Sequence, residues 1–228
     1  MFERWEIYIK EKIQDIPIND AFMIDGKCPL CYIKDQIEEQ IISKVLSNDM
    51  LISDDFVEDL KKYGFCKEHL KRLLNKNDRL SLGIILNFQF NIEIENIEKN
   101  NGLNFRDKIL KKELNNDKEC YICKYSEDLM PIYFNNIIKM YEEKPDFRSL
   151  FDESDGFCIN HYNQLINHNR IKKDMKKSLK ELEIKVLKNI QSDLKYYLEK
   201  FEFKNRDLPW LNSKDSIERT INKLIGDI

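Results

Sequence analysis

Six cysteines and two of the three histidines fall into two sets that share one spacing. The first set contains CPLC, at residues 28–31, and GFCKEH, at residues 64–69; the second contains CYIC, at 120–123, and GFCINH, at 156–161. In each set 34 residues separate the inner cysteines, and adding 92 to a position of the first set gives its counterpart in the second. This agreement indicates an internal duplication of a unit of about 90 residues.

Three cysteines and one histidine per set are ligands that zinc takes in closed tetrahedral sites. A CxxC turn brings two thiolates to one ion, and a CxxH on a helix places both side chains on one face, because residues three apart are neighbours there. A thiolate at a helix N-terminus is also stabilised by the free backbone amides. The sequence therefore predicts two structural zinc ions per chain, held by Cys28, Cys31, Cys66, His69, Cys120, Cys123, Cys158 and His161.

The pairing of these ligands is less strongly specified than their identity. The simplest arrangement takes all four ligands of an ion from one copy, although a cross-paired arrangement is also compatible with the spacing. An iron–sulfur cluster normally takes four thiolates, or two with a special pair of histidines, so zinc fits better. Redox-only thiols are an alternative, but a thioredoxin-like CxxC follows a strand, and no clear strand precedes either CxxC.

Catalysis at the metal is not expected, because four protein ligands leave no open position for water or substrate. The H-x-E and P-C-x-x-C pattern of zinc deaminases is missing as well. No glycine-rich phosphate loop or nucleophile elbow occurs elsewhere in the chain. The sequence thus predicts a protein that is not an enzyme, with no recognisable catalytic residue.

Helices are expected to position the ligands. Apolar residues recur every fourth position between 33 and 45, which is typical of one helix face. Ser53 is a candidate cap for a short helix that Gly64 would end in a left-handed conformation. Cys66 would then begin a third helix. The stretch LNFQFNIEIENI, at 86–97, alternates like a strand, but its counterpart at 177–201 has a helical stripe, so we expect helix in both.

The chain ends are expected to be helical too. Residues 2–14 place Phe2, Trp5, Ile9 and Ile13 on one helical face, and a short helix near the C-terminus would stop at Gly226. With only 6 Gly and 5 Pro in 228 residues, turns should be few and helices should dominate. We therefore predict an all-α protein built from a tandem duplication of a zinc-knuckle and helical unit.

The expected parts form one compact domain overall. They are an N-terminal helix and linker at 1–27, a first repeat at 28–110, a second repeat with a long helix at 111–203, and a C-terminal loop and short helix at 204–228. No run of about 18 apolar residues occurs, so no membrane-spanning helix is expected. A cytoplasmic location follows by default, where cysteines are more often ligands than disulfides.

Partners are only weakly indicated. The formal net charge of -3 gives no overall basic field for nucleic acid. The lysine-rich run at 170–180 could contact phosphates, but a solvated helix face is the better interpretation. His168, the one histidine outside the sets, fits a surface residue better than a third metal ligand or proton carrier. We expect a scaffold or macromolecule-interaction protein whose partner is an unknown protein. The alternatives are a nucleic-acid-binding regulator and a thiol redox or metal sensor.

The motifs in combination also resemble an uncharacterised bacterial family, catalogued as a domain of unknown function. The resemblance rests on IPINDAF before CPLC, on GFCKEH, the second CxxC and GFCINH, and on the closing RDLPWLNSKDSIERTINKLIG. It implies a helical cytoplasmic protein with metal-type cysteines and brings no activity or partner. The CxxC with a helix-borne CxxH is locally similar to treble-clef zinc sites, which is an analogy of geometry and not of function.

Overall fold

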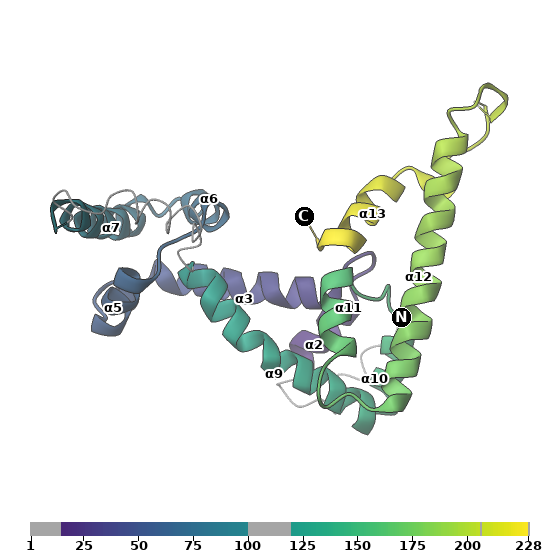
Figure 1. The fold of residues 1–228 in the computed structure, drawn as a ribbon, viewed down its shortest axis with the longest axis horizontal. Coiled ribbons are helices and arrows are strands. Elements are labelled where there is room, and N and C mark those ends of the chain that lie inside the picture. Colours follow the sequence, from purple (N-terminus) through teal and green to yellow (C-terminus); the bar gives the residue numbers. More distant parts are fainter. Residues whose placement is uncertain (1–14, 100–119, 206, 228) are drawn as a thin grey trace, which may run out of the picture. The chain divides into compact units, whose positions relative to one another are not determined.

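A computed structural model describes residues 15–99, 120–205 and 207–227, and all the elements in these ranges are helical (Figure 1). The expected helix at 2–14 lies outside the described residues. No strand occurs in the described ranges, where an isolated parallel bridge joins Gly64 and Cys120. The prediction of an all-α protein is therefore confirmed, and so is helix at 86–97. No described helix is long and apolar enough to cross a membrane.

The helices have the following bounds: α2 Ile16–Phe22, α3 Pro29–Val45, α4 Asn48–Leu51, α5 Asp54–Lys62, α6 Lys67–Asn75, α7 Arg79–Lys99, α9 Tyr121–Glu143, α10 Pro145–Glu153, α11 Ile159–Ile166, α12 Lys173–Glu199 and α13 Ser216–Ile225, with short 3-10 turns η3 Phe203–Asn205 and η4 Leu211–Ser213.

The chain divides into two compact units that do not coincide with the two copies of the repeat. Unit 1 comprises residues 1–35 and 130–228, and unit 2 comprises residues 36–129. One boundary falls inside α3 and the other inside α9. The copies expected at 28–110 and 111–203 therefore each contribute residues to both units.

The core of unit 1 is aromatic. The Phe22 ring of α2 lies 5.0 Å from Phe147, 5.8 Å from Phe151 and 5.9 Å from Phe157, measured between centroids. Tyr141 meets Phe151 edge-on at 5.0 Å. Such pairs add to the free energy gained by burying the rings. Beside this core, α12 packs against α10, α11 and α13, and Figure 1 shows α13 folded back toward α12 beyond a loop.

The loop between α12 and α13 is fastened by a buried lysine. Lys200 is 6% exposed, and its ammonium group donates to the carbonyl oxygens of Asn205 and Leu208. The same group lies 5.3 Å from the centre of the Trp210 ring, a cation–π distance. The loop is thus held by contacts within itself, while Phe203 at its tip is 92% exposed.

Unit 2 has a separate apolar core. Phe56 of α5 packs edge-on against Tyr121 at the start of α9, with ring centroids 5.2 Å apart. Buried residues of α3, α6 and α7 join the same cluster: Ile42, Val45, Leu73, Leu82 and Ile85. The far part of α7 contributes less, since Phe90 is 68% exposed. The period-two alternation seen in the sequence spreads apolar side chains around a helix, so some of them face outward.

Local signals for helix ends were confirmed in part. Gly226 ends α13 with a φ of 102°, as expected of a stop glycine. The prediction for Gly64 is wrong, because α5 ends at Lys62, Tyr63 is extended, and Gly64 has no positive φ. Instead, the Gly64 carbonyl accepts a hydrogen bond from Tyr121 N–H at 2.9 Å. Gly64 is therefore used to join two distant segments and not to terminate a helix.

Candidate metal centres

One candidate metal centre lies in unit 1, where two helix N-termini meet. Cys28 directly precedes α3 and Cys31 lies on its first turn, whereas Cys158 is the N-cap residue of α11 and His161 lies on that helix's first turn. The His161 Nδ1 atom is 3.4 Å from Cys28 Sγ and 3.3 Å from the sulfurs of Cys31 and Cys158. All four ligand atoms lie within 4.8 Å of one another, so this group could hold a metal ion.

The second candidate centre, in unit 2, has the same construction. Cys120 directly precedes α9 and Cys123 lies on its first turn, while Cys66 is the N-cap residue of α6 and His69 follows on its first turn. The His69 Nδ1 atom is 3.2 Å from Cys66 Sγ, 3.3 Å from Cys120 Sγ and 3.4 Å from Cys123 Sγ. These four ligand atoms also lie within 4.8 Å of one another.

All eight residues singled out from the sequence are therefore brought together in two sets of four, but the simplest pairing is wrong. Each CxxC meets the CxxH of the other copy, so both sets are cross-paired. In unit 2 the bond from Tyr121 N–H to the Gly64 carbonyl joins the second CxxC to the first GFC loop. Spacing could not decide this, because the two copies carry the same ligand types and either pairing gives three cysteines and one histidine.

The CPLC stretch is part of a helix and not a free turn. Pro29 is the first residue of α3, where a missing N–H is harmless and the fixed φ of proline suits the helix. The helix start leaves backbone N–H groups unpaired near the sulfurs, and these groups favour the thiolate form. In the second copy Tyr121 takes the place of the proline, and the Tyr121 N–H donates a hydrogen bond to the Gly64 carbonyl.

Crowding of the sulfurs favours a bound cation. Burial raises the pKa of the Cys28 thiol, and contacts with Cys158 and Cys31 raise it further. In unit 2 burial likewise raises the pKa of the Cys123 thiol, followed by the charge of Cys120. Several thiolates this close repel one another. A divalent cation between them removes that repulsion, because it binds the deprotonated form.

A buried ion pair holds the GFC loop of unit 1. Lys223 of α13 donates from Nζ to the carbonyls of Asp155 and Phe157, at 2.6 and 2.8 Å, and lies 3.3 Å from Glu183 Oε1. Glu183 of α12 also accepts from the Phe157 N–H at 2.9 Å. Gly156 between these carbonyls has a φ of 67°, and a Cβ there would lie 2.7 Å from Glu183 Oε2. Glu183 of α12 and Lys223 of α13 thus hold the segment that precedes Cys158 in place.

The C-terminal end of α13 lies directly over the unit 1 sulfurs. A Cβ added at Gly226 would lie 3.2 Å from Cys31 Sγ and 3.9 Å from Cys158 Sγ. The contact with Cys158 raises the pKa of the Cys31 thiol to about 12, and a hydrogen bond from the backbone of Asp227 to the same sulfur partly opposes this rise. Glycine is needed at 226 both for its positive φ and for this close approach.

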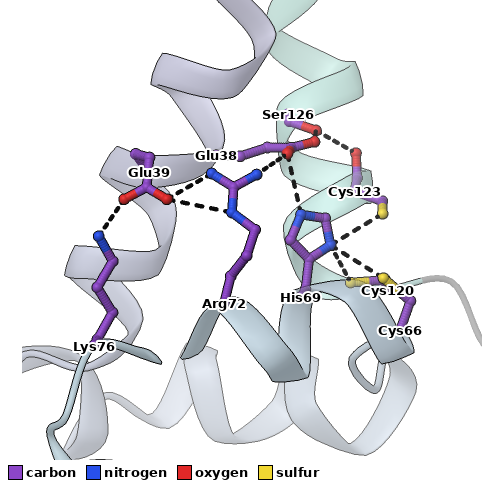
Figure 2. A network of polar contacts seen from close by, with 9 residues as sticks. All are labelled: Glu38, Glu39, Cys66, His69, Arg72, Lys76, Cys120, Cys123 and Ser126. Atoms are coloured by element: carbon purple, nitrogen blue, oxygen red, sulfur yellow. Dashed lines mark hydrogen bonds and ion pairs between the residues drawn. The ribbon is translucent and has the colours of Figure 1, made fainter. Parts of the chain in front are cut away.

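The unit 2 centre has a carboxylate that the sequence did not reveal. Glu38 of α3 places Oε2 3.2 Å from His69 Nε2, on the side of the ring away from the sulfurs, as Figure 2 shows. Arg72 Nη1 donates to the same oxygen at 2.7 Å, and Ser126 Oγ lies 3.4 Å from the other. Burial opposes protonation of His69, but Cys120 and Glu38 outweigh it and raise the pKa of the imidazole to about 10. The sequence held no signal for Glu38, because its counterpart at 130 is methionine.

The other residues weighed from the sequence lie outside both ligand groups. His168 is half-buried, its ring stacks on Phe134 at 6.1 Å, and burial followed by the charge of Arg170 lowers its pKa. In the run at 170–180, apolar residues every fourth position are buried while most lysines are exposed, and Lys172 pairs with Glu142 at 2.7 Å. This arrangement is that of a solvated helix face.

A polar cavity of about 410 Å³ lies beside the unit 1 centre, and two cations on its wall, Arg219 and Lys223, are paired with other groups. Arg219, on its wall, bonds Asp193 at 3.0 Å and Asp215 at 3.1 Å. Lys223 is bound to Glu183 and to backbone carbonyls. Asp227 also lines the cavity: its Oδ2 atom is buried without a hydrogen-bond partner, and burial raises the pKa of this carboxyl group.

Comparison with known proteins places the chain in a family. The sequence pattern of DUF6062, a family of unknown function, matches residues 9–228. The chain belongs to this family. The DUF6062 match covers both candidate centres and confirms the resemblance drawn from the CxxC and GFCxxH motifs. No curated protein and no solved structure matches the chain.

Proposed function

We propose that each set of three cysteines and one histidine binds one structural zinc ion, and that this chain is a non-enzymatic scaffold for other macromolecules. The observation that carries the zinc proposal is the separation of the donor atoms. In a tetrahedron with Zn–S bonds of about 2.3 Å and Zn–N bonds of about 2.0–2.1 Å, two sulfurs lie about 3.8 Å apart, and a sulfur and a nitrogen about 3.6 Å. The Sγ atoms of Cys31 and Cys158 lie 3.7 Å apart, and the sulfur–nitrogen distances are 3.2–3.4 Å.

A structural role is supported by the completeness of each ligand set. Four protein ligands close a zinc site, whereas catalytic zinc keeps one position for water. The sulfurs of Cys28, Cys120 and Cys158 belong to buried residues, and the other three cysteines are half-buried. Zinc would tie segments far apart in the chain, such as 28–31 and 158–161. We also propose a cytoplasmic location, where thiols stay reduced and available as ligands.

The metal content of double variants tests both the zinc and its pairing. The intact chain should contain two zinc ions after purification without added metal. Cys28→Ser with Cys158→Ser damages one cross-paired site and should leave one ion, whereas Cys28→Ser with Cys66→Ser damages both and should leave none. Within-copy pairing predicts the opposite result for the two doubles. A folded wild-type chain with free thiols and no metal, or one that releases its zinc reversibly with peroxide, would overturn a structural zinc role.

The scaffold part of the proposal is supported by the surface of the loop after α12. Phe201, Phe203 and Leu211 are 70%, 92% and 70% exposed, although Lys200 fastens the loop around them. Large apolar side chains exposed on one loop that is held in place are typical of protein contact surfaces. A photo-crosslinking residue at 203 should capture a defined protein in cells, whereas one at the exposed position 188 of the preceding helix α12 should not. Equal capture from both positions would contradict the assignment.

A further inference from the structure

The two centres differ on the far side of their histidines. In both, Nδ1 faces the sulfurs, at 3.2–3.4 Å in unit 2 and 3.3–3.4 Å in unit 1. A metal on Nδ1 leaves Nε2 as an N–H donor. In unit 2 that nitrogen meets Glu38 Oε2 at 3.2 Å. Among the described residues, no carboxylate lies within ion-pair distance of His161 in unit 1, whose ring has Phe134 beside it at 6.4 Å.

The Glu38 carboxylate is held in place by groups other than His69. Its residue is 8% exposed, and Ser126, which approaches Oε1, is completely buried. Arg72 binds the Oε2 atom at 2.7 Å, and its other guanidinium nitrogens bind Glu39 at 2.6 and 3.3 Å. Figure 2 shows the resulting chain of contacts, which ends at Lys76 on Glu39.

This network also balances charge at the centre. Zinc with three thiolates carries a net charge of about −1, so an isolated carboxylate beside it would be repelled. The positive charges of Arg72 and Lys76 offset those of Glu38 and Glu39. Glu38 can therefore accept the imidazole N–H without adding an uncompensated negative charge to a buried site.

We propose that Glu38 is a positioning residue that makes the unit 2 centre the tighter and more slowly exchanging of the two. A carboxylate on the outer nitrogen of a ligand histidine fixes the tautomer and ring orientation and makes the ligand more basic, and losing such a partner lowers metal affinity about 10- to 100-fold. Met130 stands at the equivalent position of the other copy and has no acceptor of this kind. The inference rests on the proposed function, that both centres bind zinc.

Zinc release from the full chain to a chromophoric chelator tests the assignment. The wild-type chain should lose its two ions in two phases, one ion in each. Glu38→Met, which copies the residue of the other repeat, should accelerate the slow phase about 10- to 100-fold and leave the fast phase unchanged. Glu38→Gln keeps an acceptor without the charge and should fall between. Glu39→Met, the matched control, breaks the ion pairs to Lys76 and Arg72 without touching His69, and should shift the slow phase by less than about 3-fold.

A second readout separates positioning from general loosening. In nitrogen-15 spectra of the zinc-loaded chain, the Nε2–H proton of His69 should be protected from exchange and shifted downfield by its carboxylate. Glu38→Met should remove that signal and leave the His161 signal in place. If Glu39→Met and Glu38→Met changed the zinc-release rate equally, or if Glu38→Met left this rate unchanged, the role of Glu38 would be refuted while zinc binding would stand. Fewer than two ions in the wild-type chain would instead count against the proposed function.

Discussion

Replacing Lys223 with methionine should destabilise unit 1 by about 3–5 kcal/mol, the range for removing one partner of a buried ion pair. The side chain of Lys223 is 11% exposed and that of Glu183 is 3% exposed, so water does not replace the lost contacts. Burial already raises the pKa of Glu183, against the opposing charge of Lys223. Methionine fills most of the space of lysine but leaves one carboxylate and two carbonyls, those of Asp155 and Phe157, without the ammonium donor.

Urea unfolding monitored by tryptophan fluorescence would measure this loss. The sequence has two tryptophans, so a Trp5→Phe background leaves Trp210 of unit 1 as the reporter. Lys177→Met is the control, because Lys177 is 78% exposed and 3.8 Å from its partner, and it should change the free energy of unfolding by less than about 0.5 kcal/mol. The double variant Lys223→Met with Glu183→Gln should recover part of the loss, since no buried charge remains. A loss below about 1 kcal/mol, with no recovery in the double variant, would refute the reasoning.

Three further outcomes are expected. Gly226→Ala should speed zinc release from the unit 1 centre in the chelator assay, because a Cβ would lie 3.2 Å from Cys31 Sγ at a positive φ; Gly83→Ala, with nothing within 4 Å of its Cβ, should not. Phe151→Ala should lower the free energy of unfolding by about 3–5 kcal/mol in the same urea experiment, because the ring is completely buried, whereas Ile184→Ala, 54% exposed, should have little effect. Lys76 followed by Arg72 holds the pKa of Glu39 below its usual range, so its ion pairs stabilise the folded chain above about pH 4.5 and are lost as the pH falls through the lowered pKa. Glu39→Gln should therefore make unfolding less dependent on pH between about pH 5 and 3, which urea titrations at several pH values would show.

The helices and the eight clustered residues were accessible from sequence because they depend on local chemistry and on a repeated spacing. The three-residue spacing within each CxxC and CxxH brings the two ligand atoms of that motif together, whatever the rest of the chain does. The helix at 86–97 was inferred from its counterpart and not from its own alternation, which by itself favoured a strand. Gly226 was recognised because its role is local: it directly follows α13, and its N–H bonds to the Asn222 carbonyl of that helix.

What escaped prediction depends on contacts between distant segments. Gly64 looked like a helix stop, but its carbonyl pairs with Tyr121, 57 positions away in sequence. Ser53 precedes α5 as expected, yet its side chain makes no capping bond, whereas Ser47, which was not singled out, receives one from Met50 N–H at 3.4 Å. Glu38 is not repeated in the second copy, so comparison of the copies hides it. The ligand pairing was ambiguous because both copies carry the same CxxC and CxxH ligands, so either pairing gives three cysteines and one histidine.

Cross-pairing sets an order in which the centres are completed during synthesis. The unit 2 set is complete once Cys123 has been made, but Cys28 and Cys31 wait for His161, a further 38 residues on. At about 5–20 residues per second, this delay is about 2–8 s. Before Cys120 exists, the nascent chain already carries a full ligand set from one copy, at 28–31 and 66–69. A zinc ion bound at that stage would have to exchange two of its ligands for the later cysteines. Ligand exchange would then be a step in the folding of this chain during its synthesis.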